Sequence, residues 1–185
     1  MVTLPIIHSS RLLLRPFELE DSAAVQKLAG EREIADTTLS IPHPYEDGMA
    51  EEWISSHHKE LEAGTNTVFA IVQKNSLQLI GAIGLTIDRE LDKAELGYWV
   101  GKPFWGNGYA TEAARLIVDY GFNQLHLNRI CAKHFVRNPA SGRVMQKIGM
   151  VHEGTARQDT IKWGAYEDLH LYGLLKSEWQ PIDDC

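Results

Sequence analysis

The chain has 185 residues, 44% of them hydrophobic and 23% charged, which is the composition of a globular protein long enough to bury one core. Its formal net charge of -7 argues against a nucleic-acid partner and suits a cationic substrate such as an amine. No apolar run approaches the roughly 20 residues that span a bilayer, and the N-terminus lacks a signal-peptide pattern. Cys131 and Cys185 form neither a disulfide framework nor a metal-ligand spacing. We expect one domain over residues 1–185, a cytoplasmic location and no membrane partner.

The apolar pattern predicts alternating strands and helices. Strands are expected at residues 11–15, 68–73, 77–87, 94–100 and 129–135, and two more within 150–175, joined around 162–164. Helices are expected at about 20–28, 47–63, 110–124 and 139–148, with an irregular segment over 31–45. A meander followed by a β-α-β-α-β section indicates a mixed sheet with helices on both faces.

The most informative segment is Trp-Gly-Asn-Gly-Tyr-Ala-Thr-Glu at residues 105–112, between a predicted strand and a predicted helix. Glycine exposes the backbone and accepts positive φ, which turns successive N–H groups inward. A helix that begins directly afterwards adds unpaired N–H groups and the positive end of its dipole. The segment predicts a cradle for phosphate or pyrophosphate, although a plain strand-to-helix turn would look similar. It is neither a Walker loop nor a dinucleotide fingerprint, because their further glycine and lysine positions are absent.

Three segments in this order carry a family resemblance. They are Ala-Glu-Leu-Gly-Tyr-Trp-Val at 94–100 with the loop that follows, Asn-Pro-Ala-Ser-Gly-Arg-Val-Met-Gln-Lys-Ile-Gly-Met at 138–150, and Asp-Leu-His-Leu-Tyr-Gly-Leu-Leu at 168–175. With them the chain resembles the GNAT superfamily of acetyl-CoA-dependent N-acyltransferases, in its RimJ/RimL branch of ribosomal-protein N-terminal acetyltransferases. The resemblance covers residues 10–179. It implies an α/β (α+β mixed) fold with a central, mostly antiparallel twisted sheet of about seven strands and helices on both faces.

The resemblance also implies a binding site for acetyl-CoA. The family's phosphate loop, Arg/Gln-x-x-Gly-x-Gly/Ala, maps onto Trp105, Gly108 and Ala110, and Trp105 departs from its first position. The strand before the loop would lend backbone groups to the pantetheine arm, like an added strand. The expected cofactor-binding residues are Trp99, Val100, Trp105, Gly106, Asn107, Gly108, Tyr109, Ala110, Thr111, Asn138 and Ser141.

Acetyl transfer from a thioester to an amine needs a neutral amine and a stabilised thiolate. The strand beside the thioester carries Glu95, our candidate general base through a water; a solvent-facing bystander is the equal alternative. In much of the superfamily a tyrosine protonates the thiolate, but its position here holds Met145. The resemblance assigns that role to Ser141, which is otherwise an ordinary first-turn serine. Asn138 before Pro139 is also a good helix cap.

Other polar and aromatic residues have competing interpretations. His43 and Tyr45 lie where this family forms one wall of the acceptor site, and Trp163 lies in a late hairpin that would form the opposite wall. Tyr45 could equally staple the next helix, and Trp163 could simply pack. The His57-His58 pair is interpreted as a solvated helix face, and no metal site is expected. Asp168 and Tyr172 are interpreted as structural.

The leading hypothesis is an acetyl-CoA-dependent N-acetyltransferase that acts on a primary amine, first of all the N-terminal α-amine of a protein. A small amine, such as a polyamine, amino acid or antibiotic, is the alternative acceptor. The rival hypothesis is a non-catalytic acyl-CoA-binding sensor, which would have no need of Glu95 and Ser141. The expected partners are therefore acetyl-CoA and an amine acceptor, with a second copy of the chain, in a homodimer, as a further candidate.

Overall fold

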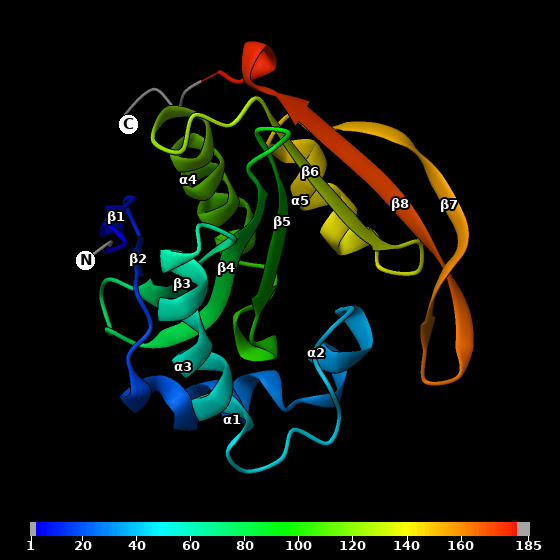
Figure 1. Ribbon diagram of the computed structural model, residues 1–185. Coiled ribbons are helices and arrows are strands. Elements are labelled where there is room, and N and C mark those ends of the chain that lie inside the picture. Colours follow the sequence, from blue (N-terminus) through cyan, green and yellow to red (C-terminus); the bar gives the residue numbers. More distant parts are fainter. Residues whose placement is uncertain (1–2, 181–185) are drawn as a thin grey trace.

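A single twisted sheet with helices on both faces forms the centre of the computed structural model, which describes residues 3–180 (Figure 1). The strands are β1 (Ile7–His8), β2 (Leu12–Arg15), β3 (Asn66–Gln73), β4 (Leu79–Asp88), β5 (Lys93–Val100), β6 (Arg129–Phe135), β7 (Val151–Lys162) and β8 (Ala165–Leu175). The α-helices are α1 (Ser22–Ala29), α2 (Arg32–Thr37), α3 (Met49–Glu62), α4 (Tyr109–Asn123) and α5 (Pro139–Lys147). Short 3-10 helices occupy Leu19–Asp21, Lys102–Phe104 and Lys176–Glu178.

The strand order is β1-β2-β3-β4-β5-β6-β8-β7, and every neighbouring pair is antiparallel except β5 and β6. The parallel pairing of β5 with β6 is short. It joins only Lys93, Ala94 and Glu95 to Arg129, Ile130 and Cys131. Beyond Glu95 the strands separate, which leaves one edge of β5 without a partner strand and opens the middle of the sheet.

Two hydrophobic cores lie on opposite faces of the sheet. Helices α4 and α5 cover one face, where the buried side chains of β5 are Ala94, Leu96 and Val100. Helices α1 and α3 cover the other face, where Trp99 is buried. Because side chains alternate along a strand, Glu95 shares its face with Trp99.

Two glycines of β4 allow the neighbouring strands to approach closely. A Cβ on Gly81 would lie 2.2 Å from the carbonyl oxygen of Trp99 in β5, and one on Gly84 would lie 2.5 Å from that of Thr67 in β3. A register shift between β3 and β4 occurs beside Gly81, opposite Ile71 and Val72.

The mixed, mostly antiparallel sheet with helices on both faces is confirmed, with eight strands in the described part rather than about seven. The extra strand, β1, is two residues long and pairs only with β2, so no local pattern marks it. The prediction that residues 31–45 are irregular was wrong at its start, because α2 occupies Arg32–Thr37 and buries Ile34 and Ala35. Among residues 3–180, no helix is long and apolar enough to cross a membrane.

Candidate active site

The glycine loop lies directly before α4, as its sequence predicts. Gly106 and Gly108 have φ values of +80° and +81°, a conformation that favours glycine. Gly108 is the N-cap residue of α4 and no side chain caps the helix, so the N–H groups of Tyr109, Ala110 and Thr111 remain for an external acceptor. Residues 105–108 are exposed. An uncapped helix end behind an exposed glycine loop fits a phosphate group.

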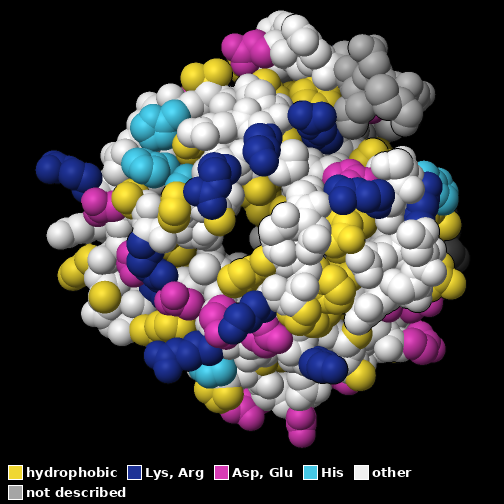
Figure 2. Space-filling view, turned by 180° about the vertical axis from the view of Figure 1, so that it is seen from behind, with side chains coloured by type: hydrophobic (Ala, Val, Ile, Leu, Met, Phe, Trp, Pro, Cys, Tyr) yellow, Lys and Arg dark blue, Asp and Glu magenta, His cyan; other side chains and the backbone are white. Residues whose placement is uncertain are grey.

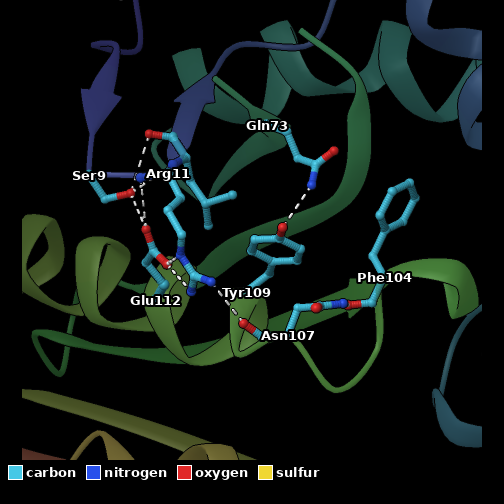
Figure 3. Close-up of polar contacts among 8 residues, drawn as sticks. Ser9, Arg11, Gln73, Phe104, Asn107, Tyr109 and Glu112 are labelled. Carbon is cyan, nitrogen blue, oxygen red and sulfur yellow. Dashed lines mark hydrogen bonds and ion pairs between the residues drawn. The ribbon is translucent and has the colours of Figure 1, made fainter. Parts of the chain in front are cut away.

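A clamp formed by Ser9 and Arg11, in the turn between β1 and β2, holds this loop (Figure 3). The Arg11 guanidinium contacts Glu112 at 2.5 Å and donates to the carbonyl oxygen of Asn107 at 3.0 Å. The Ser9 hydroxyl donates to the same Glu112 carboxylate at 2.6 Å, and the Arg11 guanidinium lies 4.8 Å from the centre of the Tyr109 ring. Arg11 therefore also offsets the negative charge of Glu112 near the helix end where an anion would bind.

Trp105, at the first position of the loop, supplies no charge; its side chain makes a hydrogen bond to the backbone instead. Its indole nitrogen donates to the carbonyl oxygen of Val100 at 2.5 Å, and its side chain is 46% exposed. Asn107 makes a similar link, since its side-chain amide donates to the carbonyl oxygens of Phe104 and Trp105 at 3.1 Å. The Val100 carbonyl is thus already engaged. The expected strand-like pairing with pantetheine therefore depends on other groups along the free edge of β5.

A cavity of about 640 Å³ lies where β5 and β6 separate. Figure 2, seen from behind Figure 1, shows an opening near the middle of the molecule. Both predicted catalytic residues, Glu95 and Ser141, line the cavity. Glu95 extends from the β5 face under α1 and α3, whereas Ser141 belongs to α5 on the opposite face. A thioester placed between the strands would have a carboxylate on one side and a hydroxyl on the other.

Glu95 has a basic partner that its sequence context did not reveal. The Lys133 Nζ lies 3.2 Å from the Glu95 carboxylate, and Lys133 lines the same cavity. The two side chains are 33% and 42% exposed, so water reaches both. Glu95 is therefore open to the cavity and to solvent, as a base acting through a water requires.

Ser141 has an unexpected partner in Tyr98. The two hydroxyl oxygens are 2.8 Å apart, and the Tyr98 hydroxyl also lies 3.2 Å from the Ser141 carbonyl oxygen. Burial raises the pKa of Tyr98 to about 12, against a smaller opposing effect of the Ser141 hydrogen bond, so the phenol stays protonated near neutral pH. A protonated phenol can donate a hydrogen bond to the Ser141 hydroxyl and so position it. Met145, one turn later, lines the cavity with an apolar side chain that cannot donate.

The remaining predicted residues are divided between the cavity and its surroundings. The Asn138 side chain caps α5 by accepting from the Ser141 N–H, which confirms the cap, and it also donates to the Thr37 carbonyl oxygen at 3.4 Å. Tyr45 lines the cavity. The His43 Nδ1 lies 3.2 Å from the Gly30 carbonyl oxygen. Trp163 is half exposed, and the Arg32 guanidinium lies 5.3 Å from the centre of its ring. Neither His43 nor Trp163 is among the described residues that line the cavity.

The interpretation of His57-His58 as a solvated face was wrong for one of the two residues. His58 is exposed, but His57 packs between Trp53 and Phe17, with ring centres 4.5 and 5.4 Å away. Burial lowers the pKa of His57 to about 4.

Within residues 3–180, no group of three His, Cys, Asp or Glu side chains is arranged to hold a metal ion. Asp168 accepts from the Gln158 N–H at 2.8 Å, and Tyr172 is buried, in keeping with structural roles. Cys185 lies outside the described residues.

Comparison with known proteins assigns the chain that forms this loop, cavity and sheet to a family. The family described as "Acetyltransferase (GNAT) domain" matches residues 11–151. The N-acetyltransferase p20 of Bacillus licheniformis is 33% identical over 175 residues, which cover 94% of this chain and 97% of the relative. The ribosomal-protein-serine acetyltransferase of Escherichia coli is 30% identical over 115 residues, 62% of this chain and 63% of the relative. The crystal structure of a GNAT-family acetyltransferase from Bacillus anthracis has a TM-score of 0.82 at 27% identity, over 94% of this chain and all of that one.

The matched residues include the glycine loop, β5 and α5, the elements that shape the cavity. Family membership implies acetyl-CoA as the acyl donor and an amine as the acceptor, and the uncapped loop and the free edge of β5 fit such a donor. The chain belongs to the GNAT acetyltransferase family, as an N-acetyltransferase of the RimJ/RimL-like kind.

Proposed function

We propose that this acetyltransferase modifies the N-terminal α-amine of a protein, by direct attack of the amine on the acetyl-CoA thioester. The observation that carries the proposal is the placement of Glu95 and the Ser141–Tyr98 pair in one cavity, on opposite faces of β5. The printed name of the Escherichia coli relative, a ribosomal-protein-serine acetyltransferase, supports a protein acceptor.

The modest base in the cavity suits an α-amine. An α-amine with a pKa of about 7.7–8.0 is roughly one-seventh neutral at pH 7, whereas a lysine amine with a pKa near 10.4 is neutral in less than about one part in a thousand. Glu95, already in contact with Lys133, needs only to assist loss of a weakly held proton. We therefore assign it to accept the amine proton through a water.

The leaving thiolate needs only a weak proton donor, because a thiol with a pKa of about 8.5 is a good leaving group. We assign that donor role to the Ser141 hydroxyl, with Tyr98 as the residue that positions it through their hydrogen bond; the proton that Ser141 gives up is replaced from solvent water. Both groups come from the face of the sheet that α4 and α5 cover, the same side as the phosphate loop. Glu95 thus acts on the N–H bond of the amine, and Ser141 acts on the sulfur of the thioester C–S bond that breaks.

The test is release of CoA thiol from acetyl-CoA, with short peptides that have free N-termini compared with small primary amines. The proposal predicts turnover on peptides with acetyl located on the α-amine by mass spectrometry. Turnover confined to small amines would contradict a protein acceptor. Acetyl-CoA binding without turnover on either panel would favour the non-catalytic sensor.

A double variant separates the enzyme from the sensor on the same protein. Glu95→Gln with Ser141→Ala should lower kcat by about 100-fold or more while acetyl-CoA affinity stays within about threefold. The matched control, Glu90→Gln with Ser55→Ala, changes the same residue types at exposed positions and should behave as wild type. Full activity in the first variant would overturn the assignment of these two residues.

A further inference from the structure

The cavity has an apolar wall on the side that Glu95 faces. Helices α1 and α3, the segment after α2 and strand β5 all contribute to it. The residues that form the wall are Val25, Ala29, Ile41, Tyr45, Trp53 and Trp99. Val25, Ala29 and Trp99 are buried parts of the α1/α3 core, so this wall is built on rigid elements. It lies across β5 from Ser141 and from the phosphate loop, on the side left for the acceptor.

Charge is sparse around this wall. Of the described residues that line the cavity, Glu95 is the only acidic one, and Lys133 is the only lysine or arginine. These two contact each other at 3.2 Å. An acceptor therefore finds one carboxylate for its ammonium group and, beyond it, mostly apolar surface. A second positive charge further along the acceptor would be buried there without a partner, which is costly.

We infer that the preferred acceptor carries a large apolar side chain, aliphatic or aromatic, on the carbon that bears the reacting amine. This inference rests on the proposed function and adds the identity of the first residue to it. The ammonium approaches Glu95, and the side chain lies against Trp99, Trp53 and Ile41, where it removes apolar surface from water. A polyamine is disfavoured, because its second ammonium would meet the apolar wall.

The same chemistry is present in a peptide N-terminus and in a free amino acid, so the experiment uses both. One peptide is made with Phe, Leu, Ala, Ser, Asp or Lys as its first residue and is otherwise constant. The free amino acids, their amides and spermidine form the second set. The inference predicts kcat/KM at least about 10-fold higher for Phe or Leu than for Ala, in whichever set is active, and the lowest values for Asp and spermidine.

Variants at the rim of the cavity link that preference to the wall. Leu39, 37% exposed, and Ile41, half-buried, lie in the segment after α2, and both line the cavity. Leu39→Ser with Ile41→Ser should lower the ratio of kcat/KM for the Phe acceptor to that for the Ala acceptor by about 5-fold or more. Leu77→Ser, in a turn outside the cavity and 74% exposed, is the matched control and should leave that ratio unchanged.

The outcomes distinguish this inference from the function on which it rests. Equal rates for all first residues, or a preference for Ala, Ser or Asp, would overturn the inference and leave the acetyltransferase assignment standing. A preference for spermidine would overturn both the inference and the proposed protein acceptor, and would move the protein to polyamine acetylation. Absence of turnover on every acceptor, with acetyl-CoA still bound, would overturn the proposed function and the inference together.

Discussion

At the scale of single residues, the site consists of two side-chain pairs, Ser141 with Tyr98 and Glu95 with Lys133. Ser141 is identified by its place after Asn138 and Pro139, but its partner Tyr98 comes from a strand 43 positions earlier. Tyr98 is part of the segment that carries the resemblance, yet nothing local shows that its hydroxyl reaches α5. Lys133 and Glu95 are related in the same way, across the only parallel strand pair of the described residues.

Removing the Ser141 hydroxyl tests its role as proton donor. Ser141→Ala should lower kcat by about 10- to 100-fold with little change in KM for acetyl-CoA, because the lost contact acts on the leaving thiolate. Tyr98 keeps a partner in this variant, the backbone carbonyl oxygen of residue 141, so folding should be preserved. Steady-state thiol release measures both constants. Tyr98→Phe should show a smaller fall of the same kind, and a change confined to KM would contradict the assignment.

His57 makes stability depend on pH. Burial lowers the pKa of His57 to about 4, while the unfolded chain titrates near 6.5, so the unfolded state binds the proton more readily. The stabilisation is complete above about pH 6.5 and is lost as the pH falls toward 4. After allowance for partial exposure, we expect this loss to be about 1–2 kcal/mol.

Urea denaturation at pH 7, 6, 5 and 4 measures that dependence. His57→Phe, which keeps an aromatic ring beside Trp53, should reduce the loss of unfolding free energy between pH 6.5 and 4. His58→Phe, at the exposed neighbouring position, should follow the wild type. Equal slopes in the wild type and His57→Phe would show that this histidine does not titrate in the window.

At the scale of elements, the phosphate loop and α4 act as one unit with the N-terminal strands. The loop conformation depends on its own glycines, but its position depends on Arg11 and Ser9, which meet Glu112 across 101 and 103 residues of chain. The Gln73 side chain adds a third link by donating to the Tyr109 hydroxyl at 2.8 Å (Figure 3). An anion site built from backbone N–H groups needs this support, because small shifts weaken every bond at once.

Breaking the clamp should weaken acetyl-CoA binding more than catalysis. Arg11→Met keeps an apolar stem over Tyr109 but releases Asn107 and leaves the Glu112 carboxylate unneutralised near the helix end. We expect KM for acetyl-CoA to rise about 5- to 10-fold, with kcat within twofold. Arg157→Met, at an exposed position of β7, is the control. A fall in kcat at unchanged KM would show that the clamp does not position the cofactor.

At the scale of the whole molecule, the sheet consists of two parts that meet at the short β5–β6 pairing. Beyond the cavity, Arg137, which follows β6, links α2 to β8: it lies 3.0 Å from the Asp36 carboxylate and 2.8 Å from that of Glu167 in β8. The Lys162 ammonium donates to the Ile41 carbonyl oxygen at 3.1 Å. These contacts tie α2 and the segment after it to β6 and the β7–β8 hairpin.

Removing the bridge should loosen α2 without unfolding the protein. Arg137→Met breaks partly exposed ion pairs, each worth about 0–1 kcal/mol, so global stability should fall by no more than about 1–2 kcal/mol. Hydrogen exchange should quicken selectively in α2 and in residues 38–41. Exchange in α4, remote from the bridge, provides the internal reference. Uniform quickening in both regions would contradict a local role for Arg137.

The sequence by itself determined the order of all strands and helices except β1, α2 and the short 3-10 helices, together with the glycine loop, the Asn138 cap and the family, because these depend on neighbouring residues and on periods of two or 3.6. Gly108 must accept a positive φ and Asn138 must cap α5 whatever surrounds them. Only the tertiary structure decided that α2 forms, that His57 packs against Phe17 and Trp53, that Tyr98 meets Ser141 and that an apolar wall faces Glu95. Those features arise from contacts between residues far apart in the chain. The Tyr98–Ser141 contact and the cavity wall depend on the register and separation of β5 and β6, and no local pattern encodes either.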